Sequence, residues 1–206
     1  MFYLLTTLFC VSLISPLCAK ESLKKLMDGN DRYVHDKLEH PNRTSERRDA
    51  LVSKQEPFAV IVGCADSRVA PEILFDQGVG DLFVVRVAGN VIGPLEIESV
   101  EYAAVYLHSS IILVMGHENC GAVNAVVQGT TKDIEAVAAL IQPSVDEARK
   151  ENPHNKDLLS ASVKKNATHM KEVLLKNAVL QKLIKEGKIE IQAAYYNLQT
   201  GAVEIL

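Results

Sequence analysis

The stretch F-A-V-I-V at residues 58–62, followed at once by G-C-A-D-S-R at 63–68, decides how this chain is organised. Five apolar residues bounded by proline and glycine are too few for a helix and predict a buried β-strand. A thiol, a carboxylate and a guanidinium then stand at alternate positions, in Cys64, Asp66 and Arg68. Such side chains at the carboxyl end of a strand indicate a ligand site, because open α/β folds bind ligands there.

A second short apolar run, I-I-L-V-M at 111–115, ends in the same way, with G-H-E-N-C-G at 116–121. If the two strands are parallel, their carboxyl ends lie at one rim of the sheet. The side chains that would meet at this rim are Cys64, Asp66, His117 and Cys120. The sequence therefore predicts an α/β fold, with a mostly parallel central sheet flanked by helices and a four-ligand metal site at its edge.

These four side chains suit one Zn²⁺ ion per chain. Two thiolates and an imidazole are favoured zinc ligands, and the Asp66 carboxylate can complete a tetrahedron. A site closed in this way is structural, whereas catalytic zinc keeps one position for water. Arg68 can take the Asp66 carboxylate in a bidentate pair and so open that position. The alternative is a Cys64–Cys120 disulfide, but a disulfide needs no metal-competent neighbours, and we favour the metal site.

The first nineteen residues differ from the rest of the chain. Residues 2–17 are almost wholly apolar, and no charge precedes Lys20. A membrane helix needs about 20 such residues, and L-C-A at 17–19 is typical of a signal-peptidase site, although no Lys or Arg precedes the apolar run. We predict a signal peptide over 1–19 and one domain over 20–206, periplasmic or secreted. An uncleaved membrane anchor and a lipidated Cys18 are the alternatives.

Composition limits the class of protein. The chain has 206 residues, of which 48% are hydrophobic, with a net charge of -4. These values indicate one globular domain with a sizeable core and argue against a nucleic-acid partner. The most basic cluster, within residues 43–48, has acidic residues interleaved and is typical of a solvated helical face.

Hydrophobic periodicity and Gly/Pro positions predict the remaining elements. Helices are expected over residues 22–34, around 50–52, and over 71–75, about 95–108, 122–128, 131–150 and 158–186; further strands are expected over 82–87, 189–196 and 202–206. A polar connector at 35–44 and a break at 152–155 separate some of them. N-R-T at 42–44 and N-A-T at 166–168 are glycosylation sequons, which matter only in a eukaryotic secretory pathway.

Three motifs resemble the β-class carbonic anhydrases: C-A-D-S-R-V-A-P-E at 64–72, F-V-V-R-V-A-G-N at 83–90 and G-H-E-N-C-G-A at 116–122. The resemblance extends from L-K-K-L-M-D-G-N at 23–30 to A-Y-Y-N-L-Q-T-G at 194–201. It implies a zinc-dependent enzyme that hydrates CO₂ reversibly to bicarbonate and a proton, by attack of zinc-bound hydroxide. It also implies a mostly parallel sheet and a homodimer or higher homo-oligomer with active sites at the subunit interface.

The resemblance also implies roles for single residues. Zinc would be held by Cys64, His117 and Cys120, with Asp66 and Arg68 as the catalytic dyad. Family members of the plant-type subgroup have a substrate-facing glutamine and two pocket aromatics. The matching positions in this chain are Gln55, Phe83 and Tyr102.

Some alternatives remain open at this stage. Ordinary core packing is the alternative role for Phe83 and Tyr102. The other subgroup uses a tryptophan in a non-catalytic bicarbonate site, and this chain has none. A non-enzymatic zinc or bicarbonate-binding protein is a second functional class, which the intact Arg68 disfavours. Hydrolysis of CS₂ or COS is a variant within the enzyme class.

The apolar leader generates a prediction about processing. We expect the mature chain to begin near Lys20, because L-C-A precedes it and the charged residues begin there. Amino-terminal sequencing of the protein purified from its own cells would measure this. Met1 retained on soluble cytosolic protein would contradict export.

Overall fold

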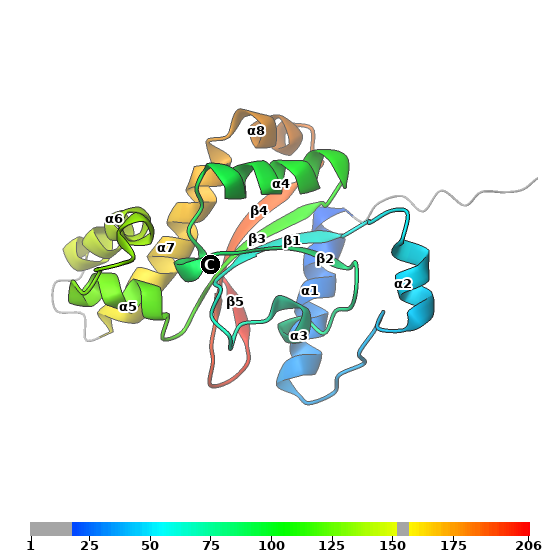
Figure 1. Cartoon of the computed structure of the whole chain (residues 1–206), viewed down its shortest axis with the longest axis horizontal. Helices are drawn as coiled ribbons and strands as arrows, with labels where there is room; N and C mark the ends of the chain where they lie inside the picture. The colour runs from blue at the N-terminus through cyan, green and yellow to red at the C-terminus, as the bar shows by residue number, and fades with distance from the viewer. Residues whose placement is uncertain (1–17, 152–156) are drawn as a thin grey trace, which may run out of the picture.

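A five-stranded sheet forms the middle of the computed structural model, which describes residues 18–151 and 157–206 (Figure 1). The strands lie in the order β2-β1-β3-β4-β5. Their bounds are β1 Ala59–Gly63, β2 Leu82–Arg86, β3 Ile111–His117, β4 Glu190–Tyr196 and β5 Val203–Ile205. All neighbouring pairs are parallel except β4 and β5, which are antiparallel. The predicted mostly parallel α/β sheet is confirmed.

Strand β1 is buried along its whole length, because helices cover both faces of the sheet. Successive side chains of a strand point to opposite faces. Val60 and Val62 accordingly belong to one hydrophobic core, and Ala59 and Ile61 belong to the other. This is why the run at 58–62 is continuously apolar instead of alternating.

Helices form the two outer layers (Figure 1). One core is built with α4 (Pro94–Tyr106), α7 (Leu158–Leu175) and α8 (Ala178–Lys185), and with α5 (Gly121–Gln128) and α6 (Glu135–Glu151) at one end. The other core is built with α1 (Ala19–Val34) and α3 (Pro71–Leu74). The remaining elements are α2 (Ser45–Leu51) and a 3₁₀ turn, η1 (Ala88–Asn90).

One predicted helix is wrong. The segment 158–186 forms two helices, α7 and α8, instead of one. Asn177 lies between them in an extended conformation, and its side-chain oxygen accepts hydrogen bonds from the backbone N–H groups of Val179 and Leu180. An Asn cap of this kind starts a new helix, because it satisfies N–H groups that have no partner in the first turn. The predicted break at 152–155 lies outside the described residues.

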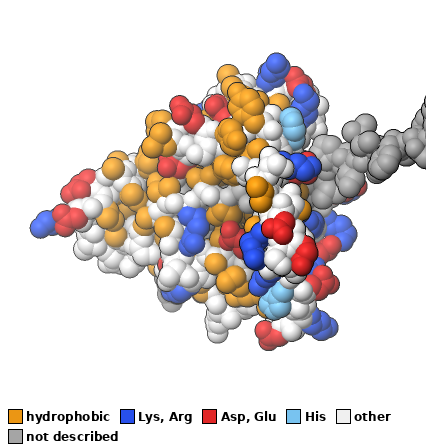
Figure 2. Space-filling model, turned by 45° about the vertical axis from the view of Figure 1, so that its right-hand side comes forward, with side chains coloured by type: hydrophobic (Ala, Val, Ile, Leu, Met, Phe, Trp, Pro, Cys, Tyr) orange, Lys and Arg blue, Asp and Glu red, His pale blue; other side chains and the backbone are white. Residues whose placement is uncertain are grey.

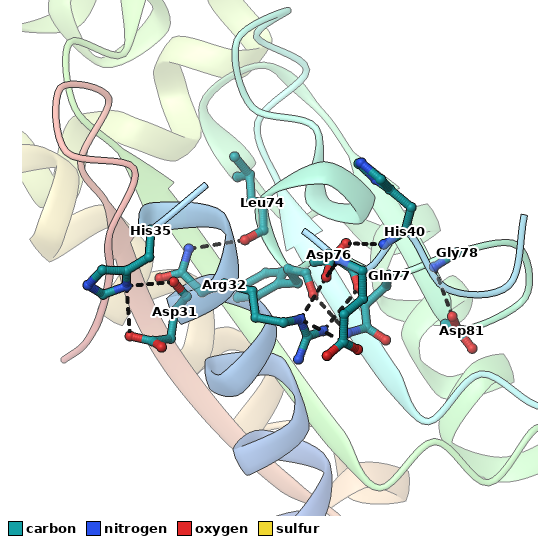
Figure 3. A network of polar contacts seen from close by, with 12 residues as sticks. Asp31, Arg32, His35, His40, Leu74, Asp76, Gln77, Gly78 and Asp81 are labelled. Carbon is teal, nitrogen blue, oxygen red and sulfur yellow. Dashed lines mark hydrogen bonds and ion pairs between the residues drawn. The ribbon is translucent and has the colours of Figure 1, made fainter. Parts of the chain in front are cut away.

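The polar connector between α1 and α2 is held in place by buried carboxylates (Figure 3). Asp76 is fully buried and accepts hydrogen bonds from the backbone N–H groups of Glu39 and His40, at 2.9 and 3.0 Å, and from Arg32 Nε at 2.7 Å. Burial works against the charge, but the donors outweigh it and lower the pKa of Asp76. The connector is therefore fixed against α3 and the sheet, although it contains no helix or strand.

The amino-terminal leader predicted from the sequence falls mostly on residues 1–17, which lie outside the described residues. The described chain begins at Cys18, and Ala19 is the first residue of α1. Within the described ranges, no helix is both long and apolar enough to cross a membrane. The division into a leader and one domain stays a prediction.

Candidate metal centre

Two parallel strands bring three metal-competent side chains together. Cys64 directly follows β1, His117 is the last residue of β3, and Cys120 immediately precedes α5. The register pairs Gly63 with Met115, so both strands end at the same edge. One ligand atom from each of the three side chains lies within 4.8 Å of the other two, and all three side chains are buried. Atoms bound to one tetrahedral zinc would lie roughly 3.5–4 Å apart, so only a small adjustment is needed.

The ring of His117 is oriented for a metal. Its Nδ1 lies 2.9 Å from the backbone carbonyl oxygen of Glu118, which fixes Nδ1 as the protonated nitrogen. Nε2 then carries the free lone pair, and it is buried without a hydrogen-bond partner among the described residues. A buried nitrogen left unpaired beside two thiols fits a zinc ion well, because zinc ligation would satisfy it.

Cys64 is prepared to act as a thiolate ligand. The adjacent Cys120 thiol is the main cause of a pKa lowered to about 4, against the opposing effect of burial. His117 and two backbone N–H groups lower it further; Gly89 N and Asp66 N lie 3.2 and 3.4 Å from Cys64 Sγ. The same contact with Cys64, together with burial, raises the pKa of Cys120. A zinc ion bound between the two sulfurs would also deprotonate Cys120, since zinc binds thiolates and not thiols.

Arg68 holds the Asp66 carboxylate beside the three ligands. Its Nε donates to Asp66 Oδ1 at 2.9 Å and its Nη2 donates to Oδ2 at 2.7 Å, the bidentate pair expected from the sequence. This contact is the main reason that the pKa of Asp66 lies well below its usual range. Oδ2 also lies 3.8 Å from His117 Nε2. The carboxylate therefore borders the ligand group while both its oxygens are bound by Arg68, and zinc ligation by Asp66 stays a prediction.

Two residues that support this site were missed in the sequence. Arg86, at the end of β2, donates from Nε to the carbonyl of Cys64 at 2.9 Å and from Nη2 to that of Asp66 at 2.6 Å. Glu118 accepts the backbone N–H of Leu198 and thus ties the end of β3 to the turn after β4. The sequence feature that could have pointed to this role of Arg86 is its position as a charged residue at the end of an apolar strand.

The predicted substrate residues do not meet the metal ligands within one chain. Phe83 pairs with Val60 near the start of β1 and β2, and its ring lies 6.3 Å from that of Tyr102. Gln55 is exposed and precedes β1, whereas the ligands follow it. Five strand residues span about 16 Å, so Gln55 lies toward the opposite end of the sheet. Their binding of substrate stays a prediction.

A mostly parallel sheet with two buried thiols and a buried imidazole at its carboxyl edge defines a zinc-binding α/β protein. The family model described as carbonic anhydrase matches residues 59–203. Carbonic anhydrase 2 of Mycobacterium tuberculosis is 38% identical over 197 residues, which cover 91% of each chain. Carbonic anhydrase of Mycolicibacterium smegmatis is 36% identical over 93% of each chain.

Solved structures agree in fold. The β-carbonic anhydrase CcaA matches with a TM-score of 0.73 and 23% identity, over 89% of this chain and 94% of that one. A Coccomyxa β-carbonic anhydrase matches with a TM-score of 0.66 and 25% identity, over 91% of this chain and 82% of that one. The chain belongs to the β-class carbonic anhydrase family, and it is a lyase whose zinc ligands are Cys64, His117 and Cys120.

The ligand set generates a prediction about zinc content. Cys120→Ser should reduce bound zinc from about one ion per chain to a small fraction, because a hydroxyl is a far poorer zinc ligand than a thiolate. Metal analysis of the purified protein measures this. His35→Ala is the control and should keep its zinc, since His35 is an exposed residue of the predicted mature chain and lies outside the ligand group. Full zinc occupancy in Cys120→Ser would refute the assignment.

Proposed function

We propose that this chain hydrates CO₂ reversibly to bicarbonate and a proton, with Asp66 and Arg68 acting as a dyad beside the zinc. The bidentate pair between these two residues carries the proposal. A closed structural site would use the carboxylate as its fourth ligand and would leave the arginine no role. When bound here, zinc supplies an ionised water as the nucleophile for CO₂.

The dyad orients and does not shuttle protons. Arg68 keeps Asp66 ionised, since the pKa of the carboxylate lies far below neutral. A carboxylate of such low basicity is a hydrogen-bond acceptor at any physiological pH and a poor general base. We assign to Asp66 the role of accepting a hydrogen bond from the ionised water that zinc would supply. This contact would align the oxygen of the nucleophile with the carbon of CO₂. Arg68 keeps the carboxylate turned away from the metal. Arg86 donates to the backbone carbonyls of Cys64 and Asp66 and so holds the segment that carries the carboxylate.

This arrangement predicts the effect of removing the guanidinium. Arg68→Ala should keep its zinc but lose CO₂ hydration by about 100-fold or more, because Asp66 loses its partner and turns toward the metal. Stopped-flow hydration assays on metal-analysed protein measure both properties. Arg48→Ala, an exposed arginine on α2, should retain wild-type turnover. Near-normal hydration in a zinc-loaded Arg68→Ala variant would show that the pair is only structural.

We propose further that a second copy of the chain completes the substrate pocket. Strand β2 is at the edge of the sheet, and its outer side pairs with no strand in the described part of the chain. Leu95 and Tyr106 on the neighbouring α4 are 73% and 71% exposed, and hydrophobic side chains are numerous on the face drawn in Figure 2. A fold relative from Sordaria macrospora, with a TM-score of 0.68, is described as tetrameric.

A homodimer or higher homo-oligomer that uses the β2 edge and α4 as its interface would explain why the predicted substrate residues lie far from the metal ligands of their own chain. Gln55, Phe83 and Tyr102 would serve the zinc of the partner and not their own. We assign this pocket to the plant-type subgroup, because these three residues match its pattern and the chain has no tryptophan.

Subunit complementation tests this arrangement. A hybrid dimer of Gln55→Ala with Arg68→Ala should recover about half of the wild-type activity, because one site then combines an intact dyad with an intact partner glutamine. The two variants would be co-expressed with different tags, and the hybrid purified on both. Each homodimer should remain impaired.

The control hybrid joins Arg68→Ala with Cys120→Ser. It should recover nothing, since neither of its sites has both zinc and an intact dyad. Failure to isolate any hybrid would remove the dimer from the proposal. A hybrid of Gln55→Ala and Arg68→Ala without recovered activity would show that Gln55 does not act across the interface.

We also propose that residues 1–19 direct the protein to the periplasm or outside the cell. This rests on the apolar sequence before Lys20 and on the L-C-A tripeptide. Export would expose thiols to oxidation, and zinc ligation would protect the two in the metal centre.

A further inference from the structure

An asparagine is buried in the apolar face of α7, where a hydrophobic residue would be expected. Asn166 is fully buried, and the residues three before and four after it on the same face of the helix, Val163 and Met170, are buried hydrophobic residues. Its Oδ1 has no hydrogen-bond partner among the described residues. Burying a half-satisfied amide destabilises a fold, so its single hydrogen bond calls for a specific role.

That bond leads to the metal centre. Asn166 Nδ2 donates to the carbonyl oxygen of Gly89 at 2.8 Å, and Gly89 N–H in turn donates to Cys64 Sγ at 3.2 Å. The amide on α7 is therefore connected through one residue of η1 to a zinc ligand on the end of β1. Asn166 and Gly89 are 77 residues apart in the chain.

The turn at Gly89 has little freedom to reach the sulfur in another way. Gly89 has φ +68°, a left-handed conformation that favours glycine. A Cβ at this position would lie 2.7 Å from Ile141 Cδ1 and 3.3 Å from the Cβ of Ala122, which is close to Cys120 in the chain. The peptide on the other side of Gly89 is held twice: Asn166 donates to its carbonyl, and its N–H, that of Asn90, donates to the carbonyl of Val87 at 2.9 Å. Asn166 is the side chain that contributes to fixing this turn, whose N–H points at Cys64.

We propose that Asn166 is a positioning residue for the metal centre, which orients the Gly89 turn so that its N–H donates to the Cys64 sulfur. A hydrogen bond to a zinc-bound thiolate withdraws electron density from the sulfur and so adjusts the charge that reaches the metal. Contacts of this kind also hold the ligand in place, and losing one weakens metal binding by about 10- to 100-fold. The inference rests on the zinc ligands assigned above but not on the proposed dyad mechanism.

The test uses the full chain and measures the metal site without measuring turnover. Asn166→Leu replaces the amide by an apolar side chain of similar size, and Asn166→Ala removes it. Both variants would be loaded with Co²⁺ to record the thiolate-to-metal charge-transfer band, and with Zn²⁺ to record its release to a chelator. We expect the band to shift and zinc release to be at least about 10-fold faster than in the wild type.

Ser162→Ala is the matched control. Ser162 is also fully buried on α7, and its hydroxyl has no hydrogen-bond partner among the described residues, so the variant should keep both the wild-type band and the wild-type release rate. Variants at 166 that lower the melting temperature but leave band and release unchanged would overturn the proposal. So would failure of both to fold while Ser162→Ala folds, because Asn166 would then support the core and not the metal site.

Discussion

The metal centre depends on the parallel pairing of β1 with β3. Gly63 lies opposite Met115, and this register places Cys64 beside the end of the strand that carries His117. A slip of one residue would move the thiol about 3.3 Å along the strand and turn it to the other face of the sheet. The continuous burial of both strands, with helices on either side, makes such a slip costly. The core therefore serves the chemistry directly, because it fixes the distance between ligands from two separate strands.

Charge is distributed unevenly around this centre. The thiols and the imidazole are buried, whereas the Arg68 side chain is 51% exposed at the rim. The guanidinium thus balances the nearby negative charge from a position where water and salt can screen it. A second subunit over this rim would exclude water and strengthen the pair. In the proposed oligomer, formation of the interface and the state of the Asp66 carboxylate would therefore be linked.

The sequence was informative where short-range features determine the structure. The apolar runs at 58–62 and 111–115 are short, are bounded by turn residues and end in metal-competent side chains, so both strands and the candidate ligands Cys64, His117 and Cys120 at their ends could be predicted. The break at Asn177 was missed, because apolar periodicity continues on both sides of it. The chain from Asn166 through Gly89 to Cys64 could not be predicted, since no local pattern relates residues so far apart. Gln55 is separated from the ligands by the length of β1, and this separation could be established only once the structure gave the bounds of β1 and its register with β3.

The burial of Asn166 has a consequence for the choice of host in which to produce this protein. The tripeptide N-A-T at 166–168 is an acceptor for N-linked sugar in a eukaryotic secretory pathway, where the sugar is added to the side-chain nitrogen of the asparagine. In the folded chain that nitrogen is the one that donates to Gly89. A glycan attached before folding cannot be accommodated in the core and would keep α7 away from the turn beside the zinc ligands. Bacterial expression avoids this modification, whereas secretion from yeast or mammalian cells would yield chains that fail to close around the metal.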